Sequence, residues 1–298
     1  MQVLKANDVD LMITAKWTAG FSGAGLANLV NEATLKAAKD GAAAVAMDHL
    51  EYATDKLLMG SERKSAGMPD SCKKMIAYHE GGHAIVAIHT DGAGPIYKAT
   101  IVPRGDFLGM VWRLAGEEYE YKSSRIKMLA RLDVLMGGRV AEELIFGEGE
   151  VSTAALSDLR KATQLAREMV ATHGMSKVVG PVSYDEDCSW QSSTLVDGEL
   201  KVLLNKAYAN AKTILTSHKS ELHALANALL KDETLTGDQI TTMLKNEVGA
   251  RDQEPVSSPV LTSGAAAAEV PCSRPRRRCR DNKQVTGDES IAKRRRVT

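Results

Sequence analysis

Residues 75–88 read MIAYHEGGHAIVAI, and the rest of the chain is best understood from this stretch. Its apolar side chains predict a helix, and residues four apart lie on one face of a helix. His79 and His83 can therefore hold one Zn²⁺ ion, with Glu80 beside them. Zinc lowers the pKa of water to about 7, and a neighbouring carboxylate can accept the proton of that water. The spacing H-E-x-x-H thus indicates zinc-dependent hydrolysis of amide bonds.

The alternative is a core helix whose histidines have no common role. Three ionisable groups on an otherwise apolar helix argue against it, because buried polar groups require partners. Gly81 and Gly82 each cost about 1 kcal/mol relative to alanine inside a helix. Their small size suits a position where another segment approaches the helix closely. The sequence therefore favours a zinc hydrolase.

The composition is that of a mainly helical protein with two domains. The chain has 298 residues and an aromatic content of 4%, which favours helices packed on small and aliphatic side chains. Four scattered cysteines form no CxxC pair, so neither a disulfide framework nor a cysteine zinc site is expected. No apolar run has the roughly 18 residues of a membrane span, and the first residues lack the features of a signal or transit peptide. As written, the chain is expected to be soluble.

Four segments follow from these patterns: a helical unit at 1–60, a linker at 61–71, a larger domain at 72–248 and a disordered tail at 249–298. Residues 270–298 carry ten Lys and Arg residues against three acids, a net charge of +7. The basic clusters of this tail lack interleaved aromatic residues, so specific nucleic-acid recognition is not expected.

Helices account for most of the expected secondary structure. In the first unit they run from Phe21-Ser22-Gly23 to Gly41 and from Met47 to Leu58, and the acids Asp48, Glu51 and Asp55 are interpreted as a solvated face. Later helices are expected at 124–146 with an interruption at Gly137-Gly138, from Ser157-Asp158 to Gly174, and at 199–215, 222–230 and 238–246. Residues 178–196 are expected to be irregular. His218 and His223 are interpreted as surface or packing residues.

Two short strands are expected after the motif helix. Residues 97–101 alternate apolar and polar side chains, and residues 108–114 form a second strand after a Pro-Arg-Gly turn. An exposed strand beside a zinc helix can bind an extended peptide through its main chain. A hairpin that only covers the core explains the same residues equally well.

The motif helix supplies two ligands, whereas a catalytic zinc requires a third protein ligand and an open position. The downstream candidates are Asp133, Glu142, Glu143, Asp158, Glu168 and His173. Asp158 stands at an expected helix start, where an aspartate most often caps the helix. Glu142 could accept the ring N–H of a zinc-bound histidine, and Glu143 could pair with Arg139. Spacing leaves these alternatives open.

Five motifs, taken in order, resemble the peptidase domain of FtsH, a family of membrane-anchored ATP-dependent zinc metalloproteases of bacteria and organelles. They are YHEGGHA (78–84), KATIVPRG (98–105), MGGRVAEELIFG (136–147), STAALSDLRKAT (152–163) and HGMSKVVGP (173–181). Residues 20–60 resemble the helical lid that ends the AAA ATPase module of this family. The resemblance covers about residues 1–247 and is greatest to the mitochondrial inner-membrane i-AAA type of plants.

The resemblance implies a mainly helical fold, in which an AAA lid remnant is followed by a zinc peptidase domain with a small β-sheet. It implies that His79, His83 and Asp158 are the zinc ligands and that Glu80 is the general base. It matches Glu142 to the acid that the family has near its zinc. It matches the residues Leu108, Gly109, Met110 and Val111 to the strand that holds the substrate.

The resemblance also implies an endopeptidase that degrades unfolded or membrane polypeptides within a hexamer of FtsH-type subunits, at the mitochondrial inner membrane or another organelle membrane. The family uses ATP, but this sequence contains no G-x-x-x-x-G-K-[S/T] phosphate-binding loop. Gly25 and Ala154 stand where the family has Asp and Gly. The alternative function is a non-catalytic subunit that joins, or interferes with, a hexamer of full-length subunits.

Overall fold

The computed structural model describes residues 4–63, 67–113, 123–184 and 189–251. The chain divides into two units, Met1–Glu254 and Pro255–Thr298, and the second unit lies outside the described residues, as does most of the tail expected at 249–298. The described part is mainly helical with one three-stranded antiparallel sheet, which confirms the expected fold class. None of the helices in this part is long and apolar enough to cross a bilayer.

The first helical unit consists of α1 (Leu11–Trp17), α2 (Gly23–Lys39) and α3 (Met47–Met59). Ser22 caps α2, because its side chain accepts a hydrogen bond from the Gly25 backbone N–H. Helices α2 and α3 pack on a small core that includes Leu29, Ala33 and Ala53. The two helices expected in this unit are present as α2 and α3, whereas α1 was not predicted from the sequence.

The interpretation of the α3 acids as a solvated face is wrong for Asp55. This side chain is buried, and both of its carboxylate oxygens accept hydrogen bonds of 2.7 Å from Lys98 Nζ. Glu51 accepts a further hydrogen bond of 2.8 Å from the same ammonium group. Helical periodicity identifies a polar face, but it does not reveal which residue packs against that face.

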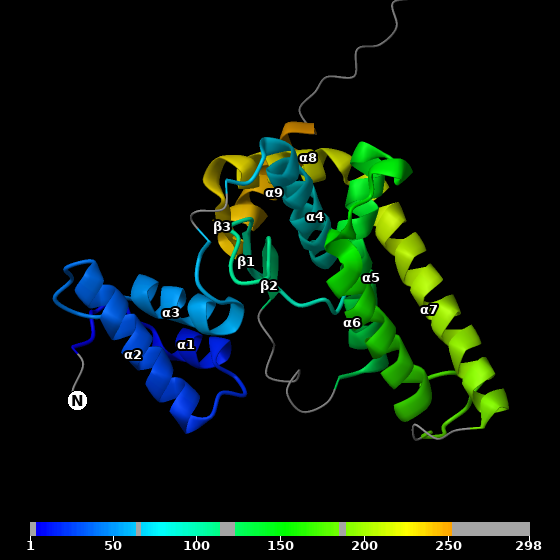
Figure 1. Cartoon of the computed structure of the whole chain (residues 1–298). Helices are drawn as coiled ribbons and strands as arrows, with labels where there is room; N and C mark the ends of the chain where they lie inside the picture. Colours follow the sequence, from blue (N-terminus) through cyan, green and yellow to red (C-terminus); the bar gives the residue numbers. More distant parts are fainter. Residues whose placement is uncertain (1–3, 64–66, 114–122, 185–188, 252–298) are drawn as a thin grey trace, which may run out of the picture. The chain divides into compact units, whose positions relative to one another are not determined.

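Helix α4 (Asp70–Ile88) is central to the larger domain, and its residues 76–87 are buried throughout. Helix α5 (Arg125–Phe146) packs along α4, α7 (Trp190–Ser217) packs on α5, and α8 (Lys219–Asp232) packs on α4 (Figure 1). Helix α6 (Leu156–Arg167) contacts α5 and continues into a π-helical turn, η4 (Glu168–Thr172). Helix α9 (Gly237–Arg251) ends the described chain.

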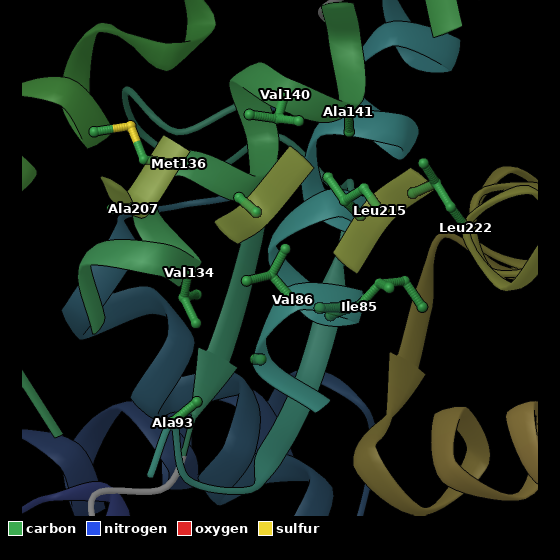
Figure 2. Close-up of a cluster of buried hydrophobic side chains, with 14 of the residues drawn as sticks. Ile85, Val86, Ala93, Val134, Met136, Val140, Ala141, Ala207, Leu215 and Leu222 are labelled. Atoms are coloured by element: carbon green, nitrogen blue, oxygen red, sulfur yellow. The ribbon is translucent and has the colours of Figure 1, made fainter. Parts of the chain in front are cut away.

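The core of this domain lies where these helices meet. Figure 2 shows Ile85 and Val86 of α4 surrounded by side chains of α5, α7 and α8, among them Val140, Leu215 and Leu222. All of these side chains are fully buried. Aliphatic packing of this kind fits the low aromatic content of the sequence.

Paired glycines allow α4 and α5 to approach each other closely. A Cβ atom added at Gly82 would lie 2.4 Å from the Gly137 carbonyl oxygen, and one added at Gly137 would lie 2.7 Å from the Gly82 carbonyl oxygen. The expected close approach at Gly82 is therefore confirmed. The expected interruption of α5 at Gly137-Gly138 is wrong, because the helix is continuous and uses these glycines for packing.

The sheet has the strand order β2-β1-β3 and is antiparallel. Its strands are β1 (Ile96–Thr100), β2 (Met110–Arg113) and β3 (Thr234–Thr236). Strand β2 lies at an edge among the described strands. The two expected strands are present, although Leu114 lies outside the described residues. Strand β3 was not expected, because three residues carry too little alternation to be recognised.

Several element boundaries differ from the sequence expectation. Helix α4 begins at Asp70, within the expected linker 61–71, and α9 continues to Arg251, beyond the expected start of the tail at 249. Helix α7 begins at Trp190, where Ser189 caps it, although residues 190–196 were expected to be irregular. The polar first turns of α7 lack the apolar periodicity that marks a buried helix.

Candidate metal centre

Three side chains from two helices converge at one point beside the α4–α5 contact. His79 and His83 of α4 place their Nε2 atoms 3.1 Å apart. The Asp158 Oδ2 atom, from the first turn of α6, lies 3.2 Å from His79 Nε2 and 3.4 Å from His83 Nε2. All three residues are buried. The structure thus brings the two motif histidines together with one of the six candidates for a third ligand.

The second nitrogen of each ring fixes its orientation. The Nδ1–H group of His79 donates to Glu142 Oε1, and that of His83 donates to the Val134 carbonyl oxygen, both at 2.7 Å. A carbonyl oxygen can only accept, so His83 carries a proton on Nδ1, which leaves Nε2 as its metal-binding nitrogen. The Glu142 carboxylate engages Nδ1 of His79 in the same way. The Nε2 atoms of both rings therefore face Asp158.

These residues fit a zinc ion. Zinc binds nitrogen and oxygen ligands at about 2.0–2.2 Å in tetrahedral sites, so neighbouring ligand atoms lie roughly 3.3 Å apart. The three observed separations of 3.1, 3.2 and 3.4 Å agree with this value. Two imidazoles and one carboxylate also form a donor set of the kind that catalytic zinc uses, and three protein ligands leave the fourth position open.

The acids around the imidazoles favour a positive charge at this point. Burial alone would lower the pKa of His79, but hydrogen bonds with Asp158 and Glu142 outweigh it and raise this pKa to about 10. Burial alone would raise the pKa of Asp158, yet its hydrogen bonds with both imidazoles hold it well below the ordinary value. The carboxylate of Asp158 is therefore ionised in the folded chain at neutral pH, as a metal ligand must be.

Glu142 is fully buried and uses both of its carboxylate oxygens. Oε1 accepts from His79 Nδ1, and Oε2 accepts from the Ser152 backbone N–H at 2.7 Å. Burial alone would raise the pKa of Glu142, but these hydrogen bonds outweigh it and lower the pKa. One carboxylate therefore orients a motif histidine and also holds the segment that leads to Asp158.

The motif glutamate faces the sheet. Glu80 is buried, and burial raises its pKa above the ordinary value. A Cβ atom added at Gly109 would lie 2.8 Å from Glu80 Oε1, so Gly109 lets residues 108–111 pass directly beside this carboxylate. The expected substrate strand and the expected base are thus neighbours, and β2 begins at Met110.

The other candidate ligands have different partners. Asp133 accepts hydrogen bonds from the Asn210 side chain, and Glu168 accepts one from Gln164. Glu143 is bound by Tyr208 and Lys212, instead of forming the expected pair with Arg139. His173 is exposed at the end of η4. Nothing in their sequence spacing separates these residues from Asp158.

Two features of the centre were missed from the sequence. The Val134 carbonyl oxygen has no side-chain signal, because it belongs to the backbone of a continuous helix. Gly138 borders the ligand atoms: a Cβ atom there would lie 2.6 Å from the Nε2 atoms of His79 and His83. Its signal was the Gly137-Gly138 pair, which was interpreted as a helix interruption.

Helix-borne histidines at i and i+4, with a glutamate between them and an acid from another helix, define the H-E-x-x-H class of zinc peptidases. Comparison of the whole sequence with known protein families identifies the family within this class. The chain belongs to peptidase family M41, whose profile matches residues 67–243. The profile of the AAA+ lid domain matches residues 8–52.

Curated relatives agree with this assignment. The chain is 51% identical over 239 residues to the ATP-dependent zinc metalloprotease FTSH 11, chloroplastic/mitochondrial, of Arabidopsis thaliana, covering 80% of this chain and 30% of the relative. It is 44% identical over 272 residues to FtsH of Caulobacter vibrioides, covering 86% and 43%. It is 47% identical over 243 residues to the YME1 homolog of Schizosaccharomyces pombe, covering 80% and 34%. The chain thus spans less than half the length of these relatives.

Proposed function

We propose that this chain is a zinc-dependent endopeptidase, with zinc held by His79, His83 and Asp158 and with Glu80 as the general base. The convergence of the three ligand atoms at tetrahedral spacing carries this proposal. Membership of peptidase family M41 supports it.

The roles of the protein groups follow from their contacts. When bound, zinc polarises the scissile carbonyl and lowers the pKa of the attacking water. Glu80 accepts the proton of this water and later delivers it to the leaving amine, for which a buried carboxylate with a raised pKa is suited. Glu142 and the Val134 carbonyl hold the two imidazoles so that their Nε2 atoms face Asp158.

The substrate is an extended polypeptide that pairs with β2. An edge strand recognises main-chain N–H and C=O groups, and Gly109 brings the start of this segment against Glu80. Recognition of this kind selects unfolded segments of soluble or membrane proteins, because most strands of folded proteins already pair with their neighbours. Leu108, Gly109, Met110 and Val111 are the proposed substrate-binding residues.

The assembly and location follow from the relatives. The match to the AAA+ lid supports a hexamer with FtsH-type subunits, and the relatives' names support ATP-dependent action. The names of the plant relative and of the YME1 homolog support an organelle, and we propose the mitochondrial inner membrane. The phosphate-binding loop that such action requires would have to be supplied by other residues than these 298.

Two substitutions test the chemistry. Glu80→Gln should retain the zinc content of wild type and lose cleavage of casein, because it removes a base and leaves the ligands. His83→Ala should lose cleavage and bind less zinc than wild type, because it removes a ligand of the catalytic ion. Metal analysis and peptide release are measured on the purified full chain. Wild-type cleavage by the Glu80→Gln protein would refute the role of Glu80, and a zinc content equal to wild type in the His83→Ala protein would refute the metal centre.

A further inference from the structure

A second cluster of potential metal-binding side chains lies at the C-terminal end of α4. It consists of His89, His218 and Glu221, whose potential ligand atoms all lie within 4.8 Å of one another. Among the described residues, only this cluster and His79–His83–Asp158 meet that condition. Nothing in the proposed peptidase chemistry uses these three residues.

The cluster joins three helix ends. His89 is the C-cap of α4, His218 lies between α7 and α8, and Glu221 is in the first turn of α8. The sequence separates His89 from the other two by more than a hundred residues, so spacing gives no signal for the cluster. A ligand bound here would tie the end of the catalytic helix to the α7–α8 corner.

The geometry directs both rings at one carboxylate. His89 Nε2 lies 2.8 Å from Glu221 Oε2, and His218 Nδ1 lies 2.7 Å from Glu221 Oε1. The two rings stack with their centroids 3.6 Å apart and their planes inclined by 17°. Each oxygen therefore has its own imidazole nitrogen, and an ion bound here would replace both hydrogen bonds and turn the stacked rings toward itself.

Charge and access also favour a cation. Glu221 is 3% exposed, whereas the side chains of His89 and His218 are 27% and 31% exposed, so the cluster is open to solvent on the histidine side. His89 is the C-cap of α4, and the partial negative charge at a helix C-terminus attracts positive charge.

Without an ion, one N–H group of each neutral ring can donate to its own Glu221 oxygen. A single divalent ion neutralises Glu221 and uses one lone pair of each neutral ring. Imidazole nitrogen with carboxylate oxygen selects zinc and its transition-metal neighbours over Mg²⁺ and Ca²⁺.

We propose that His89, His218 and Glu221 form a second, structural site for a divalent transition-metal ion, which fastens the C-terminal end of α4 to the α7–α8 corner. Such a site adds metal-dependent stability without taking part in peptide hydrolysis.

The test isolates this site in the full chain that carries His83→Ala, which disables the first cluster. Stripped of metal and titrated calorimetrically with Zn²⁺, this protein should still bind zinc and should melt at a higher temperature with zinc than without it. Adding His218→Ala should lower the zinc affinity at least about tenfold and remove the thermal shift. Zinc still held by His79 and Asp158 is common to both proteins and cancels in the comparison. Mg²⁺ at the same concentration should produce neither effect.

Two further variants keep the result interpretable. His89→Gln removes an exposed ligand from a different helix and should reproduce the loss, even if His218→Ala disturbs the α7–α8 corner. His173→Ala removes an exposed imidazole outside both clusters and should leave zinc binding unchanged. Equal zinc affinity and equal thermal shifts in the His83→Ala protein with and without His218→Ala or His89→Gln would overturn the proposal.

Discussion

At the scale of single residues, the metal centre depends on which nitrogen of each imidazole is free. The Nδ1 atoms are engaged by Glu142 and the Val134 carbonyl, so only the Nε2 atoms can bind a metal. Asp158 lies in the first turn of α6, but the N-cap position belongs to Ala155 and shows no side-chain capping. The geometry therefore favours a ligand over a helix cap at Asp158, and substitutions can measure the difference.

Asp158→Asn should weaken zinc binding more than Glu142→Gln does. The first change removes the anionic oxygen that faces both imidazoles, whereas the second removes only the charge of a group that orients His79. Loss of such an orienting group typically costs about 10- to 100-fold in metal affinity. Chelator competition at neutral pH measures both affinities. If the Asp158→Asn protein binds zinc like wild type while the Glu142→Gln protein has lost it, the ligand assignment passes to Glu142.

Asp133 should make stability depend on pH in an unusual direction. Burial raises the pKa of Asp133 to about 6, against the hydrogen bond from Asn210. The folded chain then holds this proton more tightly than the unfolded chain, so stability falls as the pH rises from about 4 to about 6. Asp133→Asn keeps an acceptor for Asn210 and removes the ionisation. Its gain in unfolding free energy over wild type should be larger at about pH 7.5 than at about pH 4.5.

Urea unfolding at the two pH values gives this difference directly. Comparison with wild type at each pH cancels the titration of all other groups, including the metal centre. Asp232→Asn, the same change at an exposed aspartate, is the matched control. A pH-independent effect of Asp133→Asn would show that Asp133 ionises normally in the folded chain.

The sequence predicted the local part of this centre and little of the rest. His79, Glu80 and His83 could be assigned because spacing on one helix fixes which residues share a face. Asp158 is 75 residues beyond His83, and only the family resemblance distinguished it from five other candidates. The Val134 carbonyl and Gly138 depend on how α5 crosses α4, which side-chain chemistry does not encode. The catalytic roles themselves remain predictions until the variants are measured.

At the scale of elements, the α4–α5 contact makes neighbouring glycines respond in opposite ways. A Cβ atom at Gly82 meets the Gly137 carbonyl oxygen and Ala141 Cβ, at 2.4 and 2.6 Å, so Gly82→Ala should lower the unfolding free energy by about 1–3 kcal/mol. A Cβ atom at Gly81 has its closest contact with the end of the Leu222 side chain at 3.1 Å. Gly81→Ala should be neutral or stabilising, because alanine gains about 1 kcal/mol in helix propensity.

Urea unfolding followed by circular dichroism compares the two variants. Both add one methyl group to the same helix at adjacent positions, so each is the control for the other. Gly82→Ala should also weaken zinc binding, because separating the helices moves His83 away from the Val134 carbonyl. Equal stability of the two variants would mean that the helices can separate without cost.

Helices were predicted correctly where the apolar periodicity was strong, and their boundaries or continuity were predicted wrongly where tertiary packing determined them. The helices α2, α3 and α5 were recognised from their apolar spacing, and Ser22 and Gly41 marked the ends of α2 to within two residues. The start of α7 at Trp190 was missed, because its first turns are polar and exposed. Glycine is a poor helix former in isolation, yet at positions 137 and 138 packing against α4 outweighs this preference.

At the scale of the whole molecule, proteolysis by these 298 residues should not depend on nucleotide. They contain no phosphate-binding loop, and an AAA+ lid alone offers neither a cradle for phosphates nor a Mg²⁺ ligand. The purified chain should therefore degrade casein, a loosely folded substrate, at the same rate with and without Mg²⁺-ATP. Peptide release with ATP, with ADP and without nucleotide measures this. Stimulation by ATP alone would show that nucleotide binds through a motif not recognised in the sequence.

The shared carboxylate of Glu142 has a consequence for the loop between α5 and α6. Surface loops usually tolerate an extra residue, and Gly149 is exposed with no neighbour within 4 Å of a Cβ atom built there. Here, however, the loop must place the Ser152 N–H against Glu142 Oε2, while Glu142 Oε1 accepts from His79. The length of this loop therefore matters for the metal centre. A one-residue insertion at exposed Gly149 should disturb the orientation of the buried ligand His79, although the inserted residue would not contact it.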